Sequence, residues 1–594
     1  MLHFNTKPDR QIGLILFSLA FILSSIANLA IATFQTNSLT EPFLLLIVSA
    51  LLLIQSLAIK ISRSVKLSEL VCLLFLFYII LKNLLVGTFD ISSLSYLSFF
   101  VILYYGLKAF FSVRNNKTAY SYTLLSAIAI ILFTYLVFAI SHCYFDNETL
   151  TSLFRPNKSI FSILLASQLA FVLPLYLNYY NEKKALEFVG WLLLVVISAS
   201  VLLLAFTQGR AGWLGLMLAL FYVAYQYLSS SRTKRMALYL LFPVFLLLTS
   251  AMFWFKSDSS NGRLLIYKIS AGMLKNNWLF GIGHGQFKVQ YNEYQAAYFA
   301  SHSIDSKEAL LADNTFYAFN DFFQTLIENG LIGFLFLATL VFLFVFQIRK
   351  AEIIPDKKHL FTASIASLIC ILTGALFSYP TQIFPIAVQA TLCLSIINSF
   401  PGGKKLQIAV YQKGSKISKI ILFLLSVLLL IHFCFYFSYK RKSYKAFELK
   451  RSGFKQKAIE KYRSLDGSYI KDGNILYLYA QELYYRNKLQ EAKWVLNNAK
   501  SYYCSNEIYK LSACIENELQ NYSQAEKDYK TAINMVPNRM ISRNDLLSYY
   551  LERRDTTNAL YWANSILNMP VKVPSQKTKN IQQKANEILI QLTK

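Results

Sequence analysis

Long runs of apolar residues, broken only by short polar connections, constrain this chain more than any other feature of its sequence. Each run holds about 20 residues, which is the length that an α-helix needs to cross a bilayer. Hydrophobic residues make up 55% of the 594 and charged residues only 15%, against roughly 25% charged in a soluble domain. The sequence therefore excludes a soluble enzyme, a secreted disulfide scaffold and a disordered chain. It predicts an all-α, polytopic membrane protein.

The apolar runs predict about 12 or 13 spans. The first run resembles a signal peptide, because Ala30-Ile31-Ala32 looks like a cleavage site. Its apolar core is too long for one, however, and more spans follow, so we predict an uncleaved helix. The spans are expected at residues 12–34, 42–59, 67–86, 92–112, 120–140, 160–178, 187–206, 211–228, 236–255, 330–347, 360–378, 382–399 and 418–438.

The basic residues predict the orientation of these spans. The net charge of +27 would indicate nucleic acid in a soluble protein, but here Lys and Arg gather in alternate short connections, as the positive-inside rule requires. The intervening connections 35–41 and 87–91 have none. We therefore predict a cytoplasmic N-terminus, an external segment at 256–329 and no nucleic-acid partner. The basic connections contain Lys7, Arg10, Lys60, Arg63, Lys66, Arg114, Lys117, Lys183, Lys184, Arg232, Lys234, Arg235, Arg349, Lys350, Lys357, Lys358, Lys404, Lys405, Lys413 and Lys416.

From residue 441 onward the chain is polar and carries a repeat. Alanines recur every 33 or 34 residues in similar settings, which is typical of tetratricopeptide (TPR) repeats, where small residues lie between paired helices. We thus predict a membrane domain at 1–440 and a TPR-like solenoid at 441–594 that binds partners rather than performing chemistry. The recurring residues are Ala458, Ala492, Ala525 and Ala559, with Ala499 and Ala532, and Pro537 and Pro570.

The sequence gives two indications for the side of the membrane on which this solenoid lies. Thirteen spans would place it outside, whereas Lys440-Arg441-Lys442, directly after the last span, would favour the cytoplasm. Residues 418–438 are too apolar to leave in water. We therefore keep the span and expect the solenoid outside.

No cofactor chemistry stands out in the chain. Its seven cysteines are scattered and mostly lie in apolar runs, without CxxC or Cys/His metal spacing. The glycine-rich stretch Phe280–Phe287 looks like a dinucleotide loop, but no βαβ unit surrounds it. We expect neither a metal nor another cofactor.

Arg210 lies between two apolar runs, beside glycines, at an external boundary. A charge within the membrane costs about 2.5–3.5 kcal/mol on insertion scales, so it needs a reason. Two interpretations stay open. Arg210 caps a tight helical turn, or it binds a phosphate group, since guanidinium donors match phosphate oxygens bidentately.

The external segment is divided by charge. Its first half is basic and suits an anionic donor, while its second half is acidic and can accept a proton from an incoming hydroxyl. Purely structural loops also show such divisions. The basic residues are Lys256, Arg263, Lys268, Lys275 and Lys288, and the acidic ones are Glu293, Asp305, Glu308, Asp313, Asp321 and Glu328.

Several motifs in order carry a family resemblance over roughly residues 120–400. Together they resemble the O-antigen ligase family, with Thr207-Gln-Gly-Arg210 at the place of the family's Ser-x-Ser-Arg element. The other motifs are Gly262-Arg263, Gly281-Ile-Gly-His-Gly-Gln-Phe287, Asp313-Asn-Thr-Phe-Tyr-Ala-Phe-Asn-Asp-Phe-Phe-Gln324 and Glu328-Asn-Gly-Leu-Ile-Gly333.

The resemblance implies a bacterial inner-membrane enzyme that transfers a glycan from undecaprenyl diphosphate to an acceptor hydroxyl, with inversion and without a metal. Ligation of O-antigen to lipid A–core is the expected reaction. Polymerisation of repeat units and transfer to protein Ser or Thr are alternatives, and a peptide-binding solenoid favours the protein acceptor somewhat. By position, Arg210 and Arg263, with Lys268, would hold the diphosphate and stabilise the charge of the leaving group.

The chain departs from the family at the expected base. Family members commonly have His-Asn where this chain has Phe319-Asn320, and phenylalanine cannot accept a proton. Asp313 is the preferred replacement, because a buried carboxylate can act as a base. His284 and Glu328 are further candidates, although Glu328 also suits a helix cap. Asn320 would orient the acceptor.

Two other classes of function compete with the enzyme. A transporter of lipid-linked glycans should show inverted repeats and ionisable groups near mid-membrane, and the spans show no such repeat. A membrane-anchored TPR scaffold would explain the tail but not the ordered motifs. We favour the enzyme, with lipid-linked glycan, an acceptor, membrane lipid and a protein on the TPR-like domain as partners.

Overall fold

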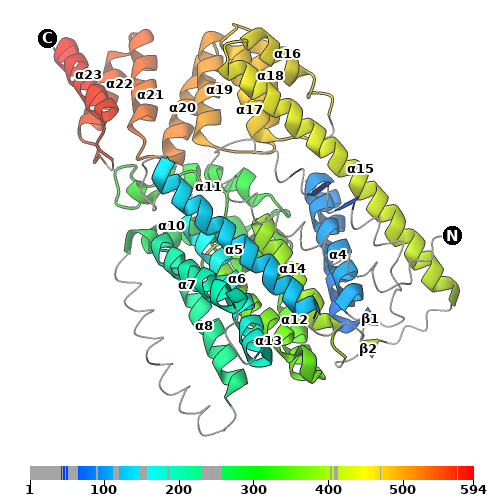
Figure 1. Ribbon diagram of the computed structural model, residues 1–594. Coiled ribbons are helices and arrows are strands. Elements are labelled where there is room, and N and C mark those ends of the chain that lie inside the picture. Colours follow the sequence, from blue (N-terminus) through cyan, green and yellow to red (C-terminus); the bar gives the residue numbers. More distant parts are fainter. Residues whose placement is uncertain are drawn as a thin grey trace. The chain divides into compact units, whose positions relative to one another are not determined.

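The computed structural model describes residues 65–87, 91–111, 119–145, 157–183, 188–228, 257–401, 405–406 and 412–593 without 469 and 572, besides single positions between 42 and 50 and at 243. Within these ranges the chain is helical almost throughout (Figure 1). One short antiparallel pair joins β1 (Val65–Lys66) to β2 (Lys405–Leu406), with Val65 opposite Leu406. The predicted all-α fold class is confirmed for the part of the chain described.

The α-helices in chain order are α3 (Leu67–Val86), α4 (Ile91–Phe111), α5 (Ala119–Phe145), α6 (Lys158–Lys183), α7 (Phe188–Thr207), α8 (Arg210–Tyr227), α10 (Ser257–Lys275), α11 (Phe287–Ser301), α12 (Asp321–Arg349), α13 (Lys358–Ala375), α14 (Phe384–Ser399), α15 (Gln412–Arg451), α16 (Lys455–Arg463), α17 (Gly473–Tyr484), α18 (Leu489–Lys500), α19 (Asn506–Glu518), α20 (Tyr522–Met535), α21 (Met540–Glu552), α22 (Thr556–Leu567) and α23 (Gln576–Thr593). Short 3-10 turns are η1 (Ala309–Leu311), η2 (Pro355–Lys357) and η3 (Pro380–Gln382).

The chain divides into two compact units. The first, here the membrane unit, comprises Met1–Trp254, Phe319–Phe322 and Gly333–Tyr444. The second, here the loop–array unit, comprises Phe255–Ala318, Phe323–Ile332 and Lys445–Lys594. The segment predicted to be external thus shares a unit with the C-terminal helices. The domain boundary expected near 440 stays a prediction.

Helices α6, α8 and α13 pack closely in the membrane unit. Small residues permit this approach: a Cβ on Gly212 of α8 would lie 2.4 Å from the carbonyl oxygen of Ser162 on α6. Ala166 of α6 and Ala366 of α13 are both fully buried. Such small-residue contacts are the usual means by which helices associate in a bilayer, where apolar surface alone gives little driving force.

Six of the described helices are long and apolar enough to cross a membrane, and they lie within α3, α6, α7, α12, η2–α13 and α15. α5 and α14 contain shorter apolar stretches. A membrane protein is therefore confirmed, whereas the predicted number of spans stays a prediction. The predicted spans 12–34, 42–59 and 236–255 lie outside the described residues, apart from single positions between 42 and 50 and at 243.

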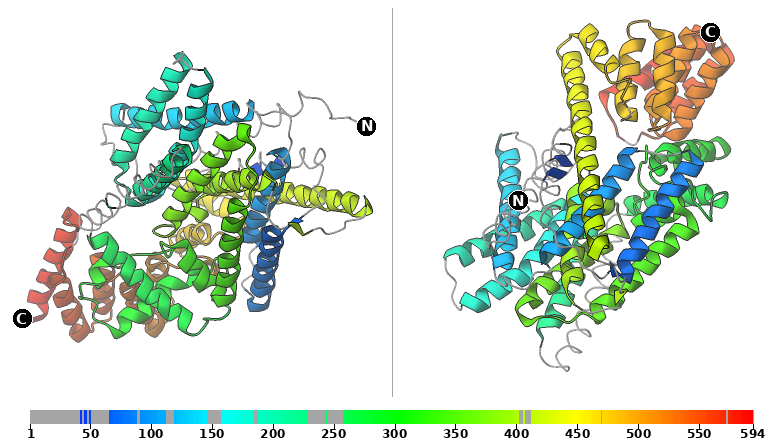
Figure 2. Two further views of the ribbon diagram at one scale, coloured as in Figure 1. Left: turned by 90° about the horizontal axis from the view of Figure 1, so that it is seen from below. Right: turned by 90° about the vertical axis from the view of Figure 1, so that its right-hand side faces the viewer.

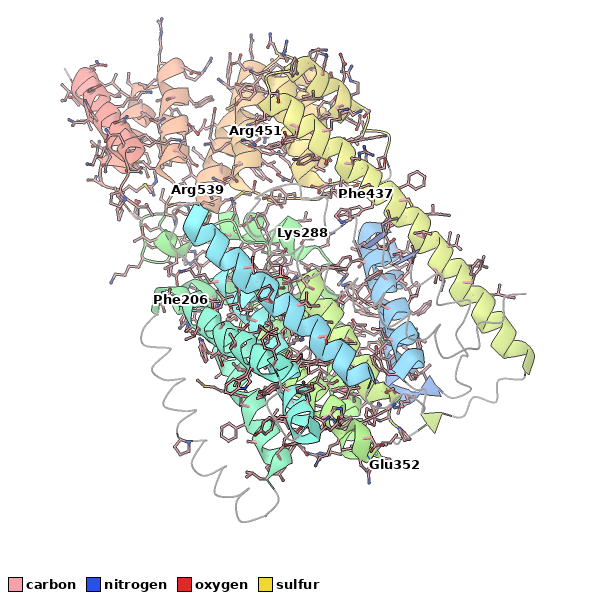
Figure 3. All side chains as sticks on the ribbon, viewed as in Figure 1. Phe206, Lys288, Glu352, Phe437, Arg451 and Arg539 are labelled. Atoms are coloured by element: carbon pink, nitrogen blue, oxygen red, sulfur yellow. The ribbon has the colours of Figure 1, made fainter. Side chains whose placement is uncertain are left out.

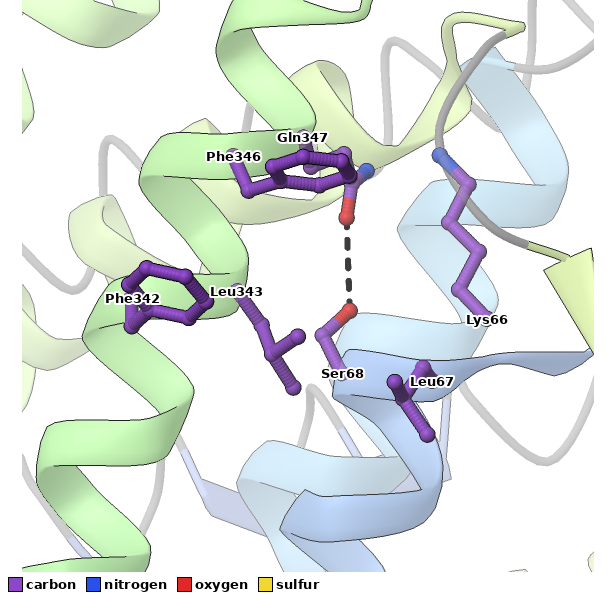
Figure 4. A pocket seen from close by; sticks show the side chains of 7 residues that line it. All are labelled: Lys66, Leu67, Ser68, Phe342, Leu343, Phe346 and Gln347. Carbon is purple, nitrogen blue, oxygen red and sulfur yellow. Dashed lines mark hydrogen bonds between the residues drawn. The ribbon is translucent and has the colours of Figure 1, made fainter.

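A pocket opens beside the start of α3 (Figure 4). The Ser68 hydroxyl donates to the Gln347 side-chain carbonyl at 3.3 Å, and the Lys66 ammonium donates to the carbonyls of Asn398 and Phe400 at 2.8 and 3.1 Å. These contacts join α3 to the ends of α12 and α14, next to connections that the basic residues predict to be cytoplasmic. The pocket residues are Lys66, Leu67, Ser68, Phe342, Leu343, Phe346 and Gln347.

In the loop–array unit, α10 and α11 pack against each other around a small hydrophobic core. Leu265, Ile269 and Met273 recur every four residues along α10 and are buried, which is the spacing of one helix face. They form one cluster with Phe287 and Tyr291 of α11, whose rings stack 5.1 Å apart. The segment is therefore a folded element with its own core.

The C-terminal helical array (residues 455–593) stacks α16 to α23 side by side (Figures 1 and 2). α17 packs on α18, α19 on α20, and α21 on α22. The recurring alanines fall in every second helix and each is fully buried, as the repeat analysis expects of small residues between paired helices. They are Ala458 in α16, Ala492 in α18, Ala525 in α20 and Ala559 in α22. The assignment of the array as a TPR solenoid stays a prediction.

Candidate active site

The glycine motif (residues 281–287) pairs with the start of the apolar part of α12. Hydrogen bonds between the two backbones run in both directions, so the motif and the helix entry fix one another. The bonds are Ile282 N–H to Ile327 O (3.0 Å), Gly283 N–H to Glu328 O (2.9 Å), Leu331 N–H to Trp278 O (2.8 Å) and Ile332 N–H to Leu279 O (3.2 Å).

This pairing explains why glycine stands at two of its positions. Gly281 and Gly330 have φ angles of 74° and 67°, which L side chains rarely adopt. A Cβ on Gly281 would lie 2.5 Å from the carbonyl oxygen of Glu328, and a Cβ on Gly330 would lie 2.3 Å from that of Leu279. Gly330 also interrupts the helical angles of α12. The glycines are therefore required by close backbone approach, not by a nucleotide.

The Glu328 side chain lies against the backbone of the glycine motif and is almost fully buried. Its carboxylate accepts the backbone N–H of Gly285 at 2.9 Å and that of Phe287 at 3.3 Å. Gln324, one turn earlier on α12, donates its side-chain N–H to the same carboxylate at 3.2 Å. Glu328 thus anchors the first turn of α11, where a carboxylate is favoured by the helix dipole.

His284 lies against this carboxylate. Its Nδ1 is 3.5 Å from Glu328 Oε2, and 23% of its side chain is exposed. The structure therefore brings together two of the residues predicted from sequence, His284 and Glu328.

The predicted cations of α10 have different surroundings. Arg263 is half-buried in the first half of the helix. The Lys268 ammonium lies 2.9 Å from Glu308 and 2.7 Å from the Tyr298 hydroxyl. The hydrogen bonds that Lys268 donates to Tyr298 and Glu308 raise the pKa of Lys268, and those that Glu308 accepts from Tyr298 and Lys268 lower the pKa of Glu308. Lys268 thus already has a carboxylate partner.

Asp313 is in contact with the C-terminal helical array. Its carboxylate lies 3.0 Å from the guanidinium of Arg539, and 65% of its side chain is exposed. The adjacent Asn314 donates to Asn506 and to Glu507, both at 2.9 Å. The residue preferred as a base from sequence is therefore part of an ion pair between the loop and the array.

In the membrane unit, Arg210 is the first residue of α8 and is half-buried. The turn before it contains Gln208 in the left-handed region, with φ 54°. Lys158, the first residue of α6, donates to the Gln208 side chain at 3.3 Å. Two helix N-termini, each with a basic residue, therefore meet at this turn, and helix N-termini favour anions.

Phe319, next to Asn320, is linked to the same end of α6 through Tyr379. The Phe319 ring packs edge-on against the Tyr379 ring at 5.3 Å between centroids. The Tyr379 hydroxyl accepts a hydrogen bond from Asn157, which caps α6 by accepting the Ile160 N–H at 3.2 Å. Phe319 has a φ of 53°, so the chain turns sharply into α12 at this position.

Asp321 was named from the sequence only as one of the acidic residues of the external segment, without a role of its own. It is buried at the start of α12, and its carboxylate accepts the backbone N–H of Thr381 at 3.0 Å. The sequence contained one signal for it: an acidic residue directly after Asn320 in a recognised motif. The sequence contained no signal for Tyr379 or Asn157, because these two hydrogen-bond partners are 222 residues apart along the chain.

The comparison with known families agrees with these motifs. The family model described as O-antigen ligase matches residues 192–338, from α7 through the glycine motif into α12. No curated protein matches the chain. The matched stretch contains Arg210, Arg263, His284, Asn320 and Glu328. Residues 192–338 of this chain are therefore similar to the O-antigen ligase domain.

Proposed function

We propose that this protein is a bacterial inner-membrane glycosyltransferase that moves a glycan from undecaprenyl diphosphate to an acceptor hydroxyl, most simply O-antigen to lipid A–core. The observation that carries the proposal is the O-antigen ligase match over residues 192–338, which covers the paired glycine motif and α12 entry. Such a reaction needs anion-binding groups, a proton acceptor and an acceptor-orienting group. The described residues contain candidates for each.

Arg210 and Arg263 hold the diphosphate in this proposal. Guanidinium groups bind phosphate oxygens in a bidentate manner and keep their charge. As the bond from the anomeric carbon to the diphosphate oxygen breaks, its electron pair leaves with the diphosphate, and the arginines stabilise the added charge. Lys268 has a smaller part, because Glu308 already offsets its charge.

His284 is our proposed base, in place of the family's histidine at Phe319. The acceptor oxygen attacks the anomeric carbon from the face opposite the diphosphate, and its proton passes to Nε2 of His284. Glu328 orients the ring and stabilises the imidazolium, as in other pairs of a histidine and a carboxylate. The configuration at the anomeric carbon inverts. Asp313, bound to Arg539, is the less favoured base.

Asn320 orients the acceptor in this proposal, and the buried carboxylate of Asp321 holds the adjoining turn through Thr381. The Phe319 and Tyr379 rings give this region an aromatic side. Aromatic faces and amide groups together suit the C–H and hydroxyl groups of a sugar or of a hydroxyl side chain.

The C-terminal helical array is proposed to be a TPR-like solenoid on the external side. Its residues are in hydrogen-bond contact with the segment 292–318, and no bilayer can lie between residues in contact. With the loop in the periplasm, the array is there too, and α15 crosses the membrane. This requires Lys440-Arg441-Lys442 to lie outside, against the positive-inside tendency.

A complementation experiment tests the proposed function. A strain without the gene receives wild type, Arg210→Ala, Arg263→Ala or Lys288→Ala at matched expression. Lys288 is the control, because it is an exposed basic residue of the same external segment. Lipid-linked glycan, lipopolysaccharide and glycoprotein are followed together.

We expect the arginine variants to accumulate lipid-linked glycan and to lose one product, which identifies the acceptor, while Lys288→Ala behaves as wild type. Loss of lipopolysaccharide supports ligation, and loss of glycoprotein supports protein glycosylation. Full activity of both arginine variants would refute the enzyme and favour a scaffold. Lipid-linked glycan confined to the cytoplasmic leaflet would instead support a transporter.

A further inference from the structure

One edge of the C-terminal helical array, at the start of α19 and the turn between α20 and α21, contacts the chain's own external segment. Asn314 of the loop accepts the backbone N–H of Asn506, the first residue of α19, at 3.1 Å. Ser505, at the N-cap position itself, gives no side-chain cap to this helix. A loop residue therefore performs the capping that a helix ordinarily receives from its own chain neighbour.

A charged cluster surrounds this cap. Arg539, in the turn between α20 and α21, lies at the edge of the array (Figure 3). Its guanidinium contacts the carboxylate of Asp313 at 3.0 Å and also pairs with Glu507. Because Arg539 joins one carboxylate of the loop to one of the array, removal of its charge leaves both acids facing each other.

Buried polar side chains add a second layer of contacts. Asn292 of α11 is fully buried, donates to the carbonyl of Cys504 at 2.7 Å and accepts the N–H of Thr315 at 2.9 Å. Gln295, one turn later, donates to the carbonyls of Asp313 and Met535. Both amides thus bind the array and the 313–315 segment at once, so the two cannot shift independently.

The array holds a second part of the loop through Arg543. This side chain is only 1% exposed, and its guanidinium lies 2.8 Å from Asp305 and donates to the carbonyl of Ile304 at 3.1 Å. Asn538 donates to the carbonyls of Leu310 and Ala312. Buried charged and amide groups of this kind are costly unless they keep their partners, so the docking is specific.

We infer that the array is a positioning module for the catalytic segment and that Arg539 is its main positioning residue. The inference rests on the proposed function. The held segment 313–318 runs directly into Asn320, while α11 begins at Phe287, whose N–H binds Glu328. The array therefore fixes both ends of the loop: the end that leads to the acceptor-orienting residue and the end that carries the base. Its edge is already filled by the chain itself, so a separate protein does not bind at this edge.

The test is a charge exchange in the full-length protein, reconstituted in lipid nanodiscs with lipid-linked glycan as donor. The variants are Arg539→Asp, Asp313→Arg and the double exchange, with Arg539→Gln as a milder change. Arg463→Ala is the control, because Arg463 pairs with Glu491 inside the array. Arg263→Ala is measured in parallel, and the elution volume of each variant reports folding.

We expect each single exchange to lower kcat by about 100-fold, the loss that a misplacement of about 1 Å can cause, with KM for the donor unchanged. The double exchange should recover part of this loss, because the ion pair between positions 313 and 539 is restored with its charges reversed, whereas the pair with Glu507 is not. Arg463→Ala should match wild type. Recovery in the double variant also separates positioning from catalysis, since the guanidinium that replaces the Asp313 carboxylate cannot act as a base.

Full activity of Arg539→Asp and Arg539→Gln, with Arg263→Ala inactive, would overturn the positioning role and leave the proposed function standing. Inactive single variants without recovery in the double exchange would also overturn it. Full activity of Arg263→Ala would instead refute the proposed function itself.

Discussion

The side chain of Asn314, in the external loop, caps the backbone of Asn506 at the start of α19, 192 residues further along the chain. The same amide donates to the side chains of Asn506 and Glu507. A single asparagine thus uses both its acceptor and its donors to hold two segments together. The folding of the array and the shape of the loop are therefore coupled.

Asn314→Ala should destabilise α19 by about 1 kcal/mol, the usual cost of a lost N-cap. The physical reason is that the Asn506 N–H loses its acceptor. Hydrogen exchange should show faster exchange in both residues 506–512 and residues 313–318. Asp472→Ala is the matched control, since Asp472 caps α17 from within the array. That variant should loosen α17 alone, and equal loosening of the loop in it would contradict the coupling.

Gly281→Ala and Gly330→Ala should each disrupt the pairing of the glycine motif with α12. Both residues have positive φ, and the added Cβ would meet backbone atoms that cannot move aside. We expect a loss of about 2 kcal/mol or more in loop stability and loss of transfer activity. Gly272→Ala is the control, because Gly272 is an exposed position of α10 where a Cβ meets nothing within 4 Å. This variant should keep or raise stability. Protease resistance of the loop measures both effects.

His284→Gln should lower kcat by about 100- to 10,000-fold, the range expected for a lost general base. Glu328→Gln should lower kcat less, because the imidazole itself remains. Measurement of kcat for wild type and both variants tests this: an unchanged kcat in His284→Gln would exclude this residue as the base.

The docking of the loop on the array should weaken in acid. Burial raises the pKa of Glu507, but the charge of Arg539, together with hydrogen bonds from Arg539, Ser505 and the backbone, holds the pKa below its ordinary value. A carboxylate with a lowered folded pKa contributes stability that is full above its unfolded pKa of about 4.3. That stability is lost as the pH falls through the lower folded value.

Hydrogen exchange in residues 313–318, corrected for the intrinsic rate at each pH, should therefore rise below about pH 4.3. Glu507→Gln carries no titrating group at this position and should show a smaller rise. An identical acid response in the variant would assign the effect to another group.

Composition and periodicity were enough to predict the all-α class and a membrane protein, because 20-residue apolar runs have few alternatives. The burial of the recurring alanines of the array could also be predicted, because their spacing follows from the local repeat. The sequence identified the motif residues but not the role of each one. A glycine-rich stretch has the same sequence pattern whether its glycines bind a phosphate or allow a second backbone to approach closely.

Contacts between distant segments could not be predicted from one sequence. Nothing in the neighbourhood of Asp313 shows that its partner is Arg539, 226 residues further on. The pairing of His284 with Glu328 was equally hidden, because it depends on the turn angles at Gly281 and Gly330. For the same reason, the segment 256–329 looked like part of the membrane domain and not like part of a unit with the C-terminal helices.

The carbonyls of Trp278 and Leu279 bind the N–H groups of Leu331 and Ile332, the first residues of the apolar stretch of α12. Trp278 is 56% exposed there, which suits a ring at a lipid–water boundary. The backbones of residues 278–283 and 327–332 are thus held in one register by these hydrogen bonds. A one-residue insertion or deletion in this stretch of α12 would therefore disrupt the glycine motif as well as the helix.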